Sequence, residues 1–506
     1  MRKVLFFLVL LTIGQRMPAQ TPTFITDSLD SYIQQGLKDW NVPGLAVVIV
    51  KDGKVVYIKG FGVQDTISHQ PVDQNTLFMI ASNTKLFTAT MLSQLEYDKK
   101  ISLDDKFTKY FPDFKLYEST TSELLTIRDL LSHRIGTKTF QGDFTFWNSR
   151  LSTEEIMKRM RLLKPEADFR SHFGYCNSCF MAAGQVIPKV TQQSWQGYVK
   201  DSILAPLGMS HTYTSVATLP DTRTFSRAYT TSFTGRLRTV PWDNWTNLAP
   251  AAALISNVSD LSHWLLFQLD SVRYEGRQVM PFAVLQKTRE VVNPISSGKY
   301  PHSPTNFVGY GLGLFVSDYN GRQVFWHTGG AAGMVSIVSF VPEERLGIAV
   351  LTNNDNQSLY GALRTQILDA YTGMPYVNRS QQALKRFAAT MTDTLKTIHG
   401  WQARVKGGAT PLPLSAYAGH YNNELYGSLD ITPGADKKKL VVTFNSHDNL
   451  KATLTYMDSD EWLLQYDNIE YGIFSVKFSL GQGKVVSLET KESDFVEIDP
   501  YIFVKE

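Results

Sequence analysis

The stretch PGLAVVIVKDGKVVYIKGFG, residues 43–62, decides the fold class of this chain. Residues 45–50 form an apolar run typical of a buried strand, Asp52-Gly53 is a turn pair, and residues 55–59 have the pattern of a returning strand. The pattern predicts a β-hairpin near the start of a folded domain.

More strands are predicted far downstream. Three or four antiparallel strands are expected in YGLGLFVSD (310–318), RQVFWHTGG (322–330) and MVSIVSFVPEERLGIAVLTNN (334–354). Between the two strand groups, helical periodicity covers residues 84–95, 127–132, 156–163 and 254–269, and a Ser152-x-x-Glu155 capping box precedes the third. Strands at both ends with helices between them predict one α/β layered domain whose sheet joins the two ends.

The sequence pattern changes from helical to strand-like in the last fifth of the chain. A helical pattern at 380–397 is followed by the Gly- and Pro-containing segment KGGATPLPL (406–414). Short runs rich in β-branched and aromatic residues follow: LVVTF, TLTYM, WLLQY, IFSVKFS and KVVSLET. They predict an all-β module of about a hundred residues, a barrel or a sandwich. The expected division is an α/β domain at 21–375, a helical linker at 376–411 and a small β-barrel domain at 412–506.

The N-terminus, MRKVLFFLVLLTIGQRMPAQ (1–20), has the layout of a secretory signal peptide. Arg2 and Lys3 are followed by an apolar run at 4–13, which is too short to span a bilayer comfortably. A buried N-terminal strand or an uncleaved anchor is the alternative. With no later apolar run of spanning length, the expectation is a soluble mature protein that is periplasmic or secreted.

Charge and composition limit the classes of binding partner that the protein is expected to have. The chain has 506 residues, 50 basic and 47 acidic, for a formal charge of +3. Removing the signal deletes Arg2, Lys3 and Arg16, which leaves 47 basic against 47 acidic residues. A near-neutral protein shows no global attraction to nucleic acid or anionic membrane. The length predicts two domains, and 43% hydrophobic residues support a full core.

The sequence FMIASNTKLFTATMLSQLE (78–96) contains Ser82-Asn83-Thr84-Lys85. If a helix begins near Ser82, Lys85 lies one turn along on the same face. A lysine in a crowded site can lose its proton and act as a base, and the helix dipole favours negative charge developing at the serine. A Ser–Lys pair is therefore chemically sufficient for nucleophilic catalysis. On its own the pattern also fits an ordinary helix cap.

Other stretches follow in a fixed order: LTIRDLLSHRIG (125–136), GYCN (174–177), PAAALISNVSDLSHWL (250–265) and HTGG (327–330). In this order and spacing, residues 25–370 resemble the β-lactamase-related serine hydrolases, which include class C β-lactamases, D-Ala-D-Ala carboxypeptidases, D-aminopeptidases and related esterases. The part beyond residue 410 resembles the lipocalin-like β-barrel appended to some of them. The resemblance implies an antiparallel sheet flanked by helices, a helical subdomain, and no metal or organic cofactor.

The resemblance also implies roles for the Tyr-x-Asn segment. Tyr175 would share proton transfer with Lys85, its phenolate form favoured by the nearby ammonium group. Asn177 would bind a substrate carbonyl and help to orient Lys85. Without Ser82 and Lys85 upstream, Tyr175 would be interpreted as a buried aromatic residue at a helix start.

His327 stands where many β-lactamases and penicillin-binding proteins have a lysine that attracts a substrate carboxylate. An ordinary histidine is mostly neutral at pH 7 and is a poorer anion anchor, so protonation below about pH 6 should mimic the lysine. Gly329 and Gly330 would let substrate lie against the strand, and the resemblance places the oxyanion hole at the N–H groups of Ser82 and Gly330. An ordinary strand histidine is the alternative for His327.

Cys176 and Cys179 are the only cysteines, and Cys176 is the middle residue of the Tyr-x-Asn segment. They are interpreted as packing residues or as a local disulfide. A zinc site would need two histidines such as His133 and His172, and no spacing supports it. His133 is expected to support the site from outside.

The function expected from the sequence is an exported serine hydrolase. It would cleave amide or ester bonds, in D-amino-acid peptides including cell-wall-derived ones or in small esters, through an acyl-enzyme on Ser82. The alternatives are a penicillin-binding-type sensor with little turnover, a true β-lactamase, or a ligand-binding role for the barrel. The expected partner is a small-molecule or peptide substrate.

Overall fold

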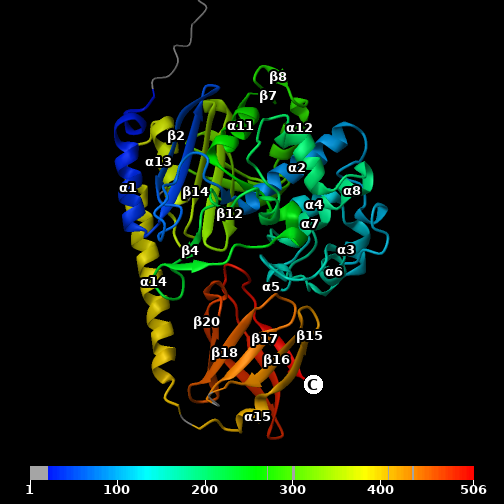
Figure 1. Ribbon diagram of the computed structural model, residues 1–506. Coiled ribbons are helices and arrows are strands. Elements are labelled where there is room, and N and C mark those ends of the chain that lie inside the picture. The colour runs from blue at the N-terminus through cyan, green and yellow to red at the C-terminus, as the bar shows by residue number, and fades with distance from the viewer. Residues whose placement is uncertain (1–20, 271, 299–302, 408, 436–437) are drawn as a thin grey trace, which may run out of the picture.

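A computed structural model describes residues 21–506 except 271, 299–302, 408 and 436–437 (Figure 1). The signal peptide expected at 1–20 therefore lies outside the described residues. The chain forms a large α/β domain and a small β-barrel, joined by a long helix that runs along both (Figure 1).

An eight-stranded antiparallel sheet forms the centre of the α/β domain. Its order is β2-β1-β14-β13-β12-β11-β10-β9, and Val47 of β1 pairs with Val350 of β14. The prediction of a sheet that joins the two ends of the domain is thus confirmed. The strands are β1 (Gly44–Lys51), β2 (Lys54–Gly62), β9 (Asn293–Ser297), β10 (Phe307–Tyr310), β11 (Phe315–Tyr319), β12 (Arg322–Ala331), β13 (Met334–Val341) and β14 (Leu346–Thr352).

The hairpin of β1 and β2 closes as its sequence predicts. Asp52 and Gly53 have φ angles of 50° and 77°. Positive φ at both central residues is the type I′ geometry, whose twist matches that of the strands it connects.

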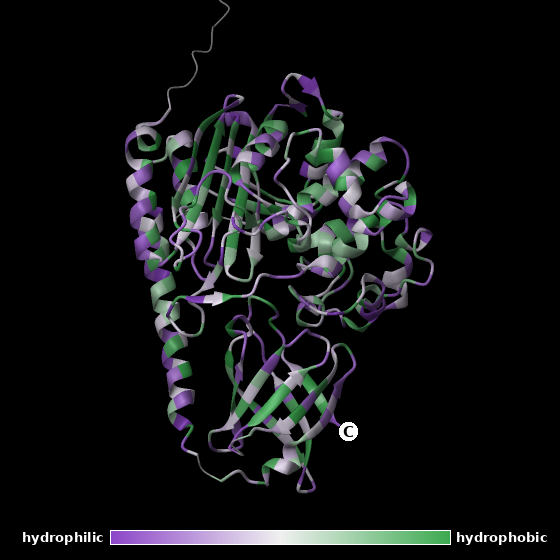
Figure 2. Ribbon diagram, in the orientation of Figure 1, coloured by the Kyte–Doolittle hydropathy of each residue, from purple (hydrophilic) through white to green (hydrophobic). Residues whose placement is uncertain are grey.

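Both faces of the sheet are buried. Leu45, Val47 and Ile49 pack on the side of helices α1 (Leu29–Asp39) and α13 (Leu359–Thr372). The alternate residues of β1 pack with α2 (Thr84–Tyr97) and α11 (Val258–Leu269). Burial on both faces explains the continuous apolar run in β1, and Figure 2 shows the same hydrophobic character along the central strands.

A helical region between β2 and β9 covers the second face. Ser152 and Glu155 form the expected capping box at the start of α6. The helix predicted at 254–269 begins only at Val258, because Ile255 and Ser256 pair with a short strand before Ser82. The short elements here are β3 (Phe78–Met79), α3 (Ser119–Leu124), α4 (Ile127–Leu131), α5 (Asp143–Phe146), α6 (Thr153–Arg159), α7 (Asn177–Gly184), α8 (Val186–Thr191), α9 (Trp195–Val199), β4 (Ala228–Thr230), β5 (Arg238–Val240), α10 (Ala249–Ala252), β6 (Ile255–Ser256), β7 (Arg273–Tyr274), β8 (Arg277–Gln278) and α12 (Phe282–Arg289).

The C-terminal module is a closed barrel of eight antiparallel strands, so the barrel alternative is confirmed. Aromatic side chains such as Tyr421, Trp462 and Phe503 are buried in it. Its elements are α15 (Leu414–Tyr417), β15 (Gly419–Asn423), β16 (Gly427–Pro433), β17 (Leu440–Phe444), β18 (Lys451–Tyr456), β19 (Glu461–Tyr466), β20 (Ile473–Gly481), β21 (Lys484–Thr490) and β22 (Tyr501–Lys505).

Helix α14 (Arg379–Arg404) connects the two domains and is longer than the predicted 380–397. Leu384 and Phe387 near its start pack against the α1 and α13 side of the sheet. Ile398 near its end packs with Met457 and Leu463 of the barrel. In the described part of the chain, neither this helix nor any other has the length and apolar character needed to cross a bilayer.

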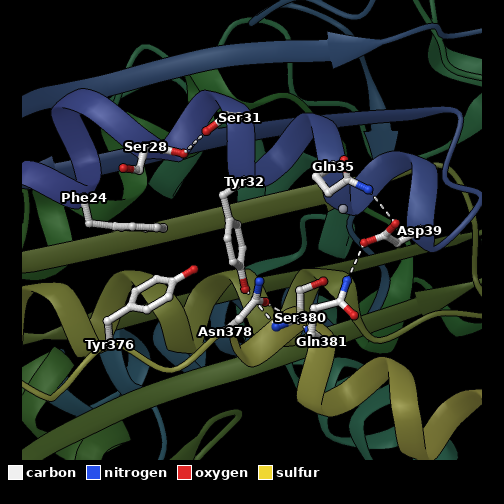
Figure 3. Close-up of a pocket in the computed structure, with 11 residues that line it drawn as sticks. Phe24, Ser28, Ser31, Tyr32, Gln35, Asp39, Tyr376, Asn378, Ser380 and Gln381 are labelled. Carbon is white, nitrogen blue, oxygen red and sulfur yellow. Dashed lines mark hydrogen bonds between the residues drawn. The ribbon is translucent and has the colours of Figure 1, made fainter.

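A cavity of about 300 Å³ lies between α1 and the start of α14 (Figure 3). Its polar groups bond across the helix pair: Ser380 N–H donates to the Tyr32 hydroxyl at 2.8 Å, and Gln381 Nε2 donates to Asp39 at 2.6 Å. The cavity lies on the sheet face opposite α2 and is best described as the seam between two helices.

Candidate active site

Ser82 lies in a single 3₁₀ turn, Ala81–Asn83, immediately before α2. Ala81 has a φ of 47°, the left-handed region that non-glycine residues rarely adopt. Such strain clusters at functional sites where the surroundings hold it in place. Here Asn83 Nδ2 donates to the Ile80 carbonyl at 3.1 Å and to Ser336 Oγ of β13 at 2.9 Å. The serine turn is therefore fixed to the sheet.

Lys85 is fully buried one turn along α2, as its spacing predicts. Its Nζ lies 2.9 Å from Ser82 Oγ, 2.7 Å from Asn177 Oδ1 and 3.0 Å from the Ala251 carbonyl. Burial lowers the pKa of Lys85 to about 7. As a neutral amine, Lys85 keeps two hydrogens for the amide and carbonyl oxygens, and its lone pair faces the serine hydroxyl.

Tyr175 lies just before α7, with its ring 4.8 Å from Lys85 Nζ. The Ser82 side chain interacts with the Tyr175 hydroxyl, and this interaction alone would lower the pKa of Tyr175. Burial raises the pKa of Tyr175 above its ordinary value and outweighs the opposing effect of Ser82, so the expectation of a phenolate is wrong. The structure leaves Tyr175 as a phenol, which can give a proton, and leaves Lys85 as the base.

Asn177, the first residue of α7, is held from both ends of its amide. Its Oδ1 accepts from Lys85 and its Nδ2 donates to Asp143 Oδ2 at 2.6 Å. Asp143, at the start of α5, is buried, which raises the pKa of its carboxyl well above the ordinary value. Sequence reasoning missed Asp143 because QGDFTFW carries no spacing signal that connects it with the other site residues.

His327 lies on β12 with both ring nitrogens engaged. Nδ1 lies 2.6 Å from the Thr328 carbonyl and Nε2 lies 3.0 Å from the Tyr310 hydroxyl. These partners fit a neutral ring that donates through Nδ1 and accepts from the phenol at Nε2. Burial lowers the pKa of His327 to about 3, so the expected protonation below about pH 6 is wrong. Tyr310, at the end of β10, was not foreseen.

The two glycines of HTGG are crowded by different neighbours. A Cβ added to Gly329 would lie 2.0 Å from the Ile80 carbonyl, and one added to Gly330 would lie 2.9 Å from the Phe495 ring. Gly329 therefore lets β12 approach the serine turn, where space for substrate had been expected. Gly330 lies against a residue of the barrel domain, which the sequence did not predict.

Cys176 and Cys179 are free and buried, with their sulfur atoms 2.6 Å apart. Cys176 N–H donates to His133 Nδ1 at 3.0 Å, and the His133 ring stacks on Tyr175 at a centroid distance of 4.2 Å. His133 thus touches the site from behind the tyrosine. Within the described ranges, no group of three or more His, Cys, Asp or Glu residues is placed to hold a metal ion.

A loop of the barrel domain holds the segment that carries Asp143. The Glu497 carboxylate accepts the N–H groups of Gly142 and Phe144 at 2.8 and 2.9 Å, and the Tyr501 hydroxyl at 2.7 Å. Burial raises the pKa of Glu497 to about 7. Through Asp143 and Asn177, this barrel contact reaches Lys85.

The sheet, the helix-start serine and the buried lysine define the class of protein: a β-lactamase-type fold with a serine-hydrolase site. A family model described as "Beta-lactamase" matches residues 29–372, so the chain belongs to that family. A model described as "Domain of unknown function (DUF3471)" matches residues 403–503.

Individual relatives agree with this assignment. "Protein flp" of Staphylococcus aureus (strain NCTC 8325 / PS 47) is 29% identical over 353 residues, which cover 67% of this chain and 66% of that protein. "Unguisins hydrolase ungD" of Aspergillus violaceofuscus (strain CBS 115571) is 24% identical over 458 residues, covering 84% of this chain and 80% of that protein. The octameric penicillin-binding protein homologue from Pyrococcus abyssi is similar in fold, with a TM-score of 0.61, 22% identity, and coverage of 95% of this chain and 100% of that one.

Proposed function

We propose that this protein is a serine hydrolase that cleaves amide or ester bonds through an acyl-enzyme on Ser82. One observation carries the proposal: the Lys85 amine, with its pKa lowered to about 7, lies 2.9 Å from Ser82 Oγ. An amine that is substantially neutral at pH 7 and directed at a hydroxyl is a general base at hydrogen-bond distance from its target.

The reaction follows from these positions. Lys85 takes the Ser82 proton as Oγ attacks the substrate carbonyl, and the N–H groups of Ser82 and Gly330 stabilise the oxyanion. The Tyr175 phenol gives a proton to the leaving group and regains one from the Lys85 ammonium. Water then attacks the acyl-enzyme, with Lys85 again as base, and releases the acid and free Ser82.

The substrate class follows from what the site provides. His327 is neutral and both of its nitrogens are engaged, so it gives no fixed positive charge to a substrate carboxylate. We therefore propose D-amino-acid peptides or small esters as substrates, ahead of penicillins. Export is part of the proposal and rests on the layout of residues 1–20.

The test is covalent labelling of the full chain with a fluorophosphonate and, separately, with a labelled penicillin. We expect one adduct by intact mass, lost in Ser82→Ala and kept in Ser119→Ala, an exposed serine at the start of α3. An adduct that persists in Ser82→Ala contradicts the assignment. A penicillin adduct without turnover of any ester supports the sensor alternative, and fast penicillin hydrolysis supports the β-lactamase alternative.

Export is tested by expressing the full chain in a Gram-negative host and determining the N-terminus of the periplasmic protein. We expect a new N-terminus near residue 20. Protein found only in the cytoplasm with Met1 retained would contradict export.

A further inference from the structure

A cavity of about 350 Å³, named here the interdomain pocket, lies where three parts of the molecule meet. Its walls come from the end of β4, the segment after β14, helix α14 and two loops of the barrel, all of which converge above the barrel in Figure 1. Its lining includes aromatic and acidic side chains: Phe233, Asp355, Phe387, Glu470, Phe474, Asp494 and Phe495.

The interdomain pocket adjoins the candidate active site through Phe495. This ring lines the pocket and also touches Gly330, where an added Cβ would lie only 2.9 Å away. Next along the chain, Ala332 N–H donates to Asp243 at 2.7 Å and Gly333 N–H donates to Asp355 at 2.8 Å. The turn after β12 therefore leads directly from the proposed oxyanion donor to the pocket wall.

The titratable side chains that line the described part of the pocket are all acidic. Asp355, Glu470 and Asp494 line it, and among the described residues its lining includes no lysine, arginine or histidine. Asp494 is exposed and pairs with Lys491 at 2.7 Å, which leaves the two inner carboxyls without a cation. Behind them Asp243 accepts hydrogen bonds from Trp147, Asn148 and the Ala332 N–H. Burial favours the neutral form of the inner carboxyls, and a positive group that enters the pocket would favour their ionised form.

The buried Glu470 carboxyl, which belongs to the pocket lining, is only partly satisfied by hydrogen bonds. Its side chain is 4% exposed, and in the described part of the chain its Oε1 has no hydrogen-bond partner, while Oε2 accepts from Asn468 at 3.3 Å. Burial, with Asp243 and Asp355 nearby, raises the pKa of Glu470 well above its ordinary value. A buried acceptor without a donor is unfavourable, and a bound cation with N–H groups would remove that cost.

The walls distinguish an organic cation from a metal ion. Phe233, Phe387, Phe474 and Phe495 present aromatic surface in the same cavity. Metal ligation requires carboxylates close together, and in the described ranges no group of three or more acidic, His or Cys residues meets that condition. Aromatic faces beside carboxylates are suited to an ammonium or guanidinium group on an apolar stem.

We propose that the interdomain pocket is a substrate subsite for a primary ammonium or guanidinium group carried on an apolar stem, with Glu470 as its main partner. As a subsite, the pocket rests on the proposed function at Ser82. A substrate held there would lie past Gly330 and against Phe495. The barrel domain thereby takes part in selecting the substrate.

The test uses phenethylammonium and its neutral counterpart phenethyl alcohol with the full chain. Isothermal titration calorimetry should give a Kd for the ammonium at least about tenfold lower than for the alcohol, since charge-assisted hydrogen bonds are the stronger class. Glu470→Gln should abolish the difference. Glu489→Gln, which removes the same charge from an exposed position on β21, should preserve it. Asp355→Asn serves as a second pocket variant if Glu470→Gln does not fold.

The link to catalysis is tested by measuring fluorophosphonate labelling of Ser82 at saturating phenethylammonium. The ammonium should slow labelling in wild type and not in Glu470→Gln. Equal binding of the two probes, or an ammonium preference that survives Glu470→Gln, overturns the pocket assignment. Ammonium binding with unchanged labelling overturns its role as a subsite. If Ser82 is never labelled but Glu470-dependent binding remains, the proposed function fails and the binding site stands.

Discussion

Around Lys85, three oxygen atoms lie within 3.0 Å of Nζ, whereas in the interdomain pocket Oε1 of Glu470 has no hydrogen-bond partner among the described residues. Both groups are buried. Burial lowers the pKa of Lys85 and raises that of Glu470, and both shifts favour the neutral form. The difference lies in the surroundings. The lysine is held by its own chain in a geometry for proton transfer, while the glutamate is left for an external donor. Changes at Lys85 should therefore affect all substrates, and changes at Glu470 only charged ones.

The largest effect is expected from Lys85→Met, which keeps the length of the side chain and removes the base. We expect kcat/KM for a neutral ester and for a cationic ester to fall by about 10³–10⁴-fold alike, the upper part of the range for general-base groups. Steady-state kinetics on both esters measures it. Lys158→Met, an exposed lysine on α6, is the control. A loss restricted to the cationic ester would contradict the expectation that Lys85 acts on all substrates and Glu470 only on charged ones.

Tyr175→Phe should be the next largest change. Because Tyr175 is held as a phenol, its loss removes a proton donor and leaves the base in place. We expect kcat to fall by about 10²-fold with little change in KM, and the loss to be smaller for substrates whose leaving group needs no proton. Comparing a p-nitrophenyl ester with an anilide checks this. An equal loss of kcat on both substrates would mean that Tyr175 positions other groups and does not donate a proton to the leaving group.

The pH dependence of kcat/KM in the range 5–9 should be set mainly by Lys85. The active form is the neutral amine, so activity should rise about tenfold per pH unit below the pKa of about 7 and level off above it. His327, with its pKa lowered to about 3, should add no feature in this range, and Tyr175 should give no alkaline fall below pH 9. A pH series from 5 to 9 measures the profile. A rise in activity on acidification for carboxylate-bearing substrates would show that His327 titrates after all.

The sequence predicts those parts of the protein that depend on local patterns of residues better than those that depend on the folded structure. The sheet and the barrel follow from local periodicity, and Ser82, Lys85, Tyr175 and Asn177 occupy short segments that can be recognised one by one. The charge states were harder to predict. The phenolate expected at Tyr175 and the titration expected at His327 both assumed solvated groups, and burial in the folded domain reversed them.

The barrel contacts were beyond sequence reasoning for a different reason. Asp143, Phe495 and Glu497 belong to segments without a spacing signal, and they meet only because two domains pack together. Glu497 and Gly142 are 355 positions apart in the chain. A pairing over that distance leaves no trace in periodicity or in local motifs.

Glu497→Gln tests whether the barrel influences catalysis. The Glu497 carboxylate accepts hydrogen bonds from Gly142, Phe144 and Tyr501. In the glutamine variant, the amide nitrogen would face one of these donors and could not accept its hydrogen bond. We expect the free energy of unfolding to fall by about 1–3 kcal/mol, the cost of an unmet buried hydrogen bond. kcat should fall a few-fold, and the midpoint of the pH profile should move because Asp143 and Asn177 orient Lys85. Loss of stability with unchanged kinetics would limit Glu497 to a structural role.

The smallest effect is expected from replacing Cys176 and Cys179 together with serine. Neither sulfur is hydrogen-bonded to Ser82 or Lys85, and Cys176 bonds locally to Ser178 and Cys179. The plateau of kcat/KM should therefore stay within about threefold of wild type. Cys176 does raise the pKa of Lys85 through its charge, so its loss should lower that pKa and move the acid limb to lower pH by less than about one unit. The double variant should thus gain slightly at pH 6 relative to wild type while the plateau is unchanged. A limb that moves to higher pH would mean that the serine hydroxyls change how Lys85 is solvated, and an inactive but folded variant would return the cysteines to the mechanism.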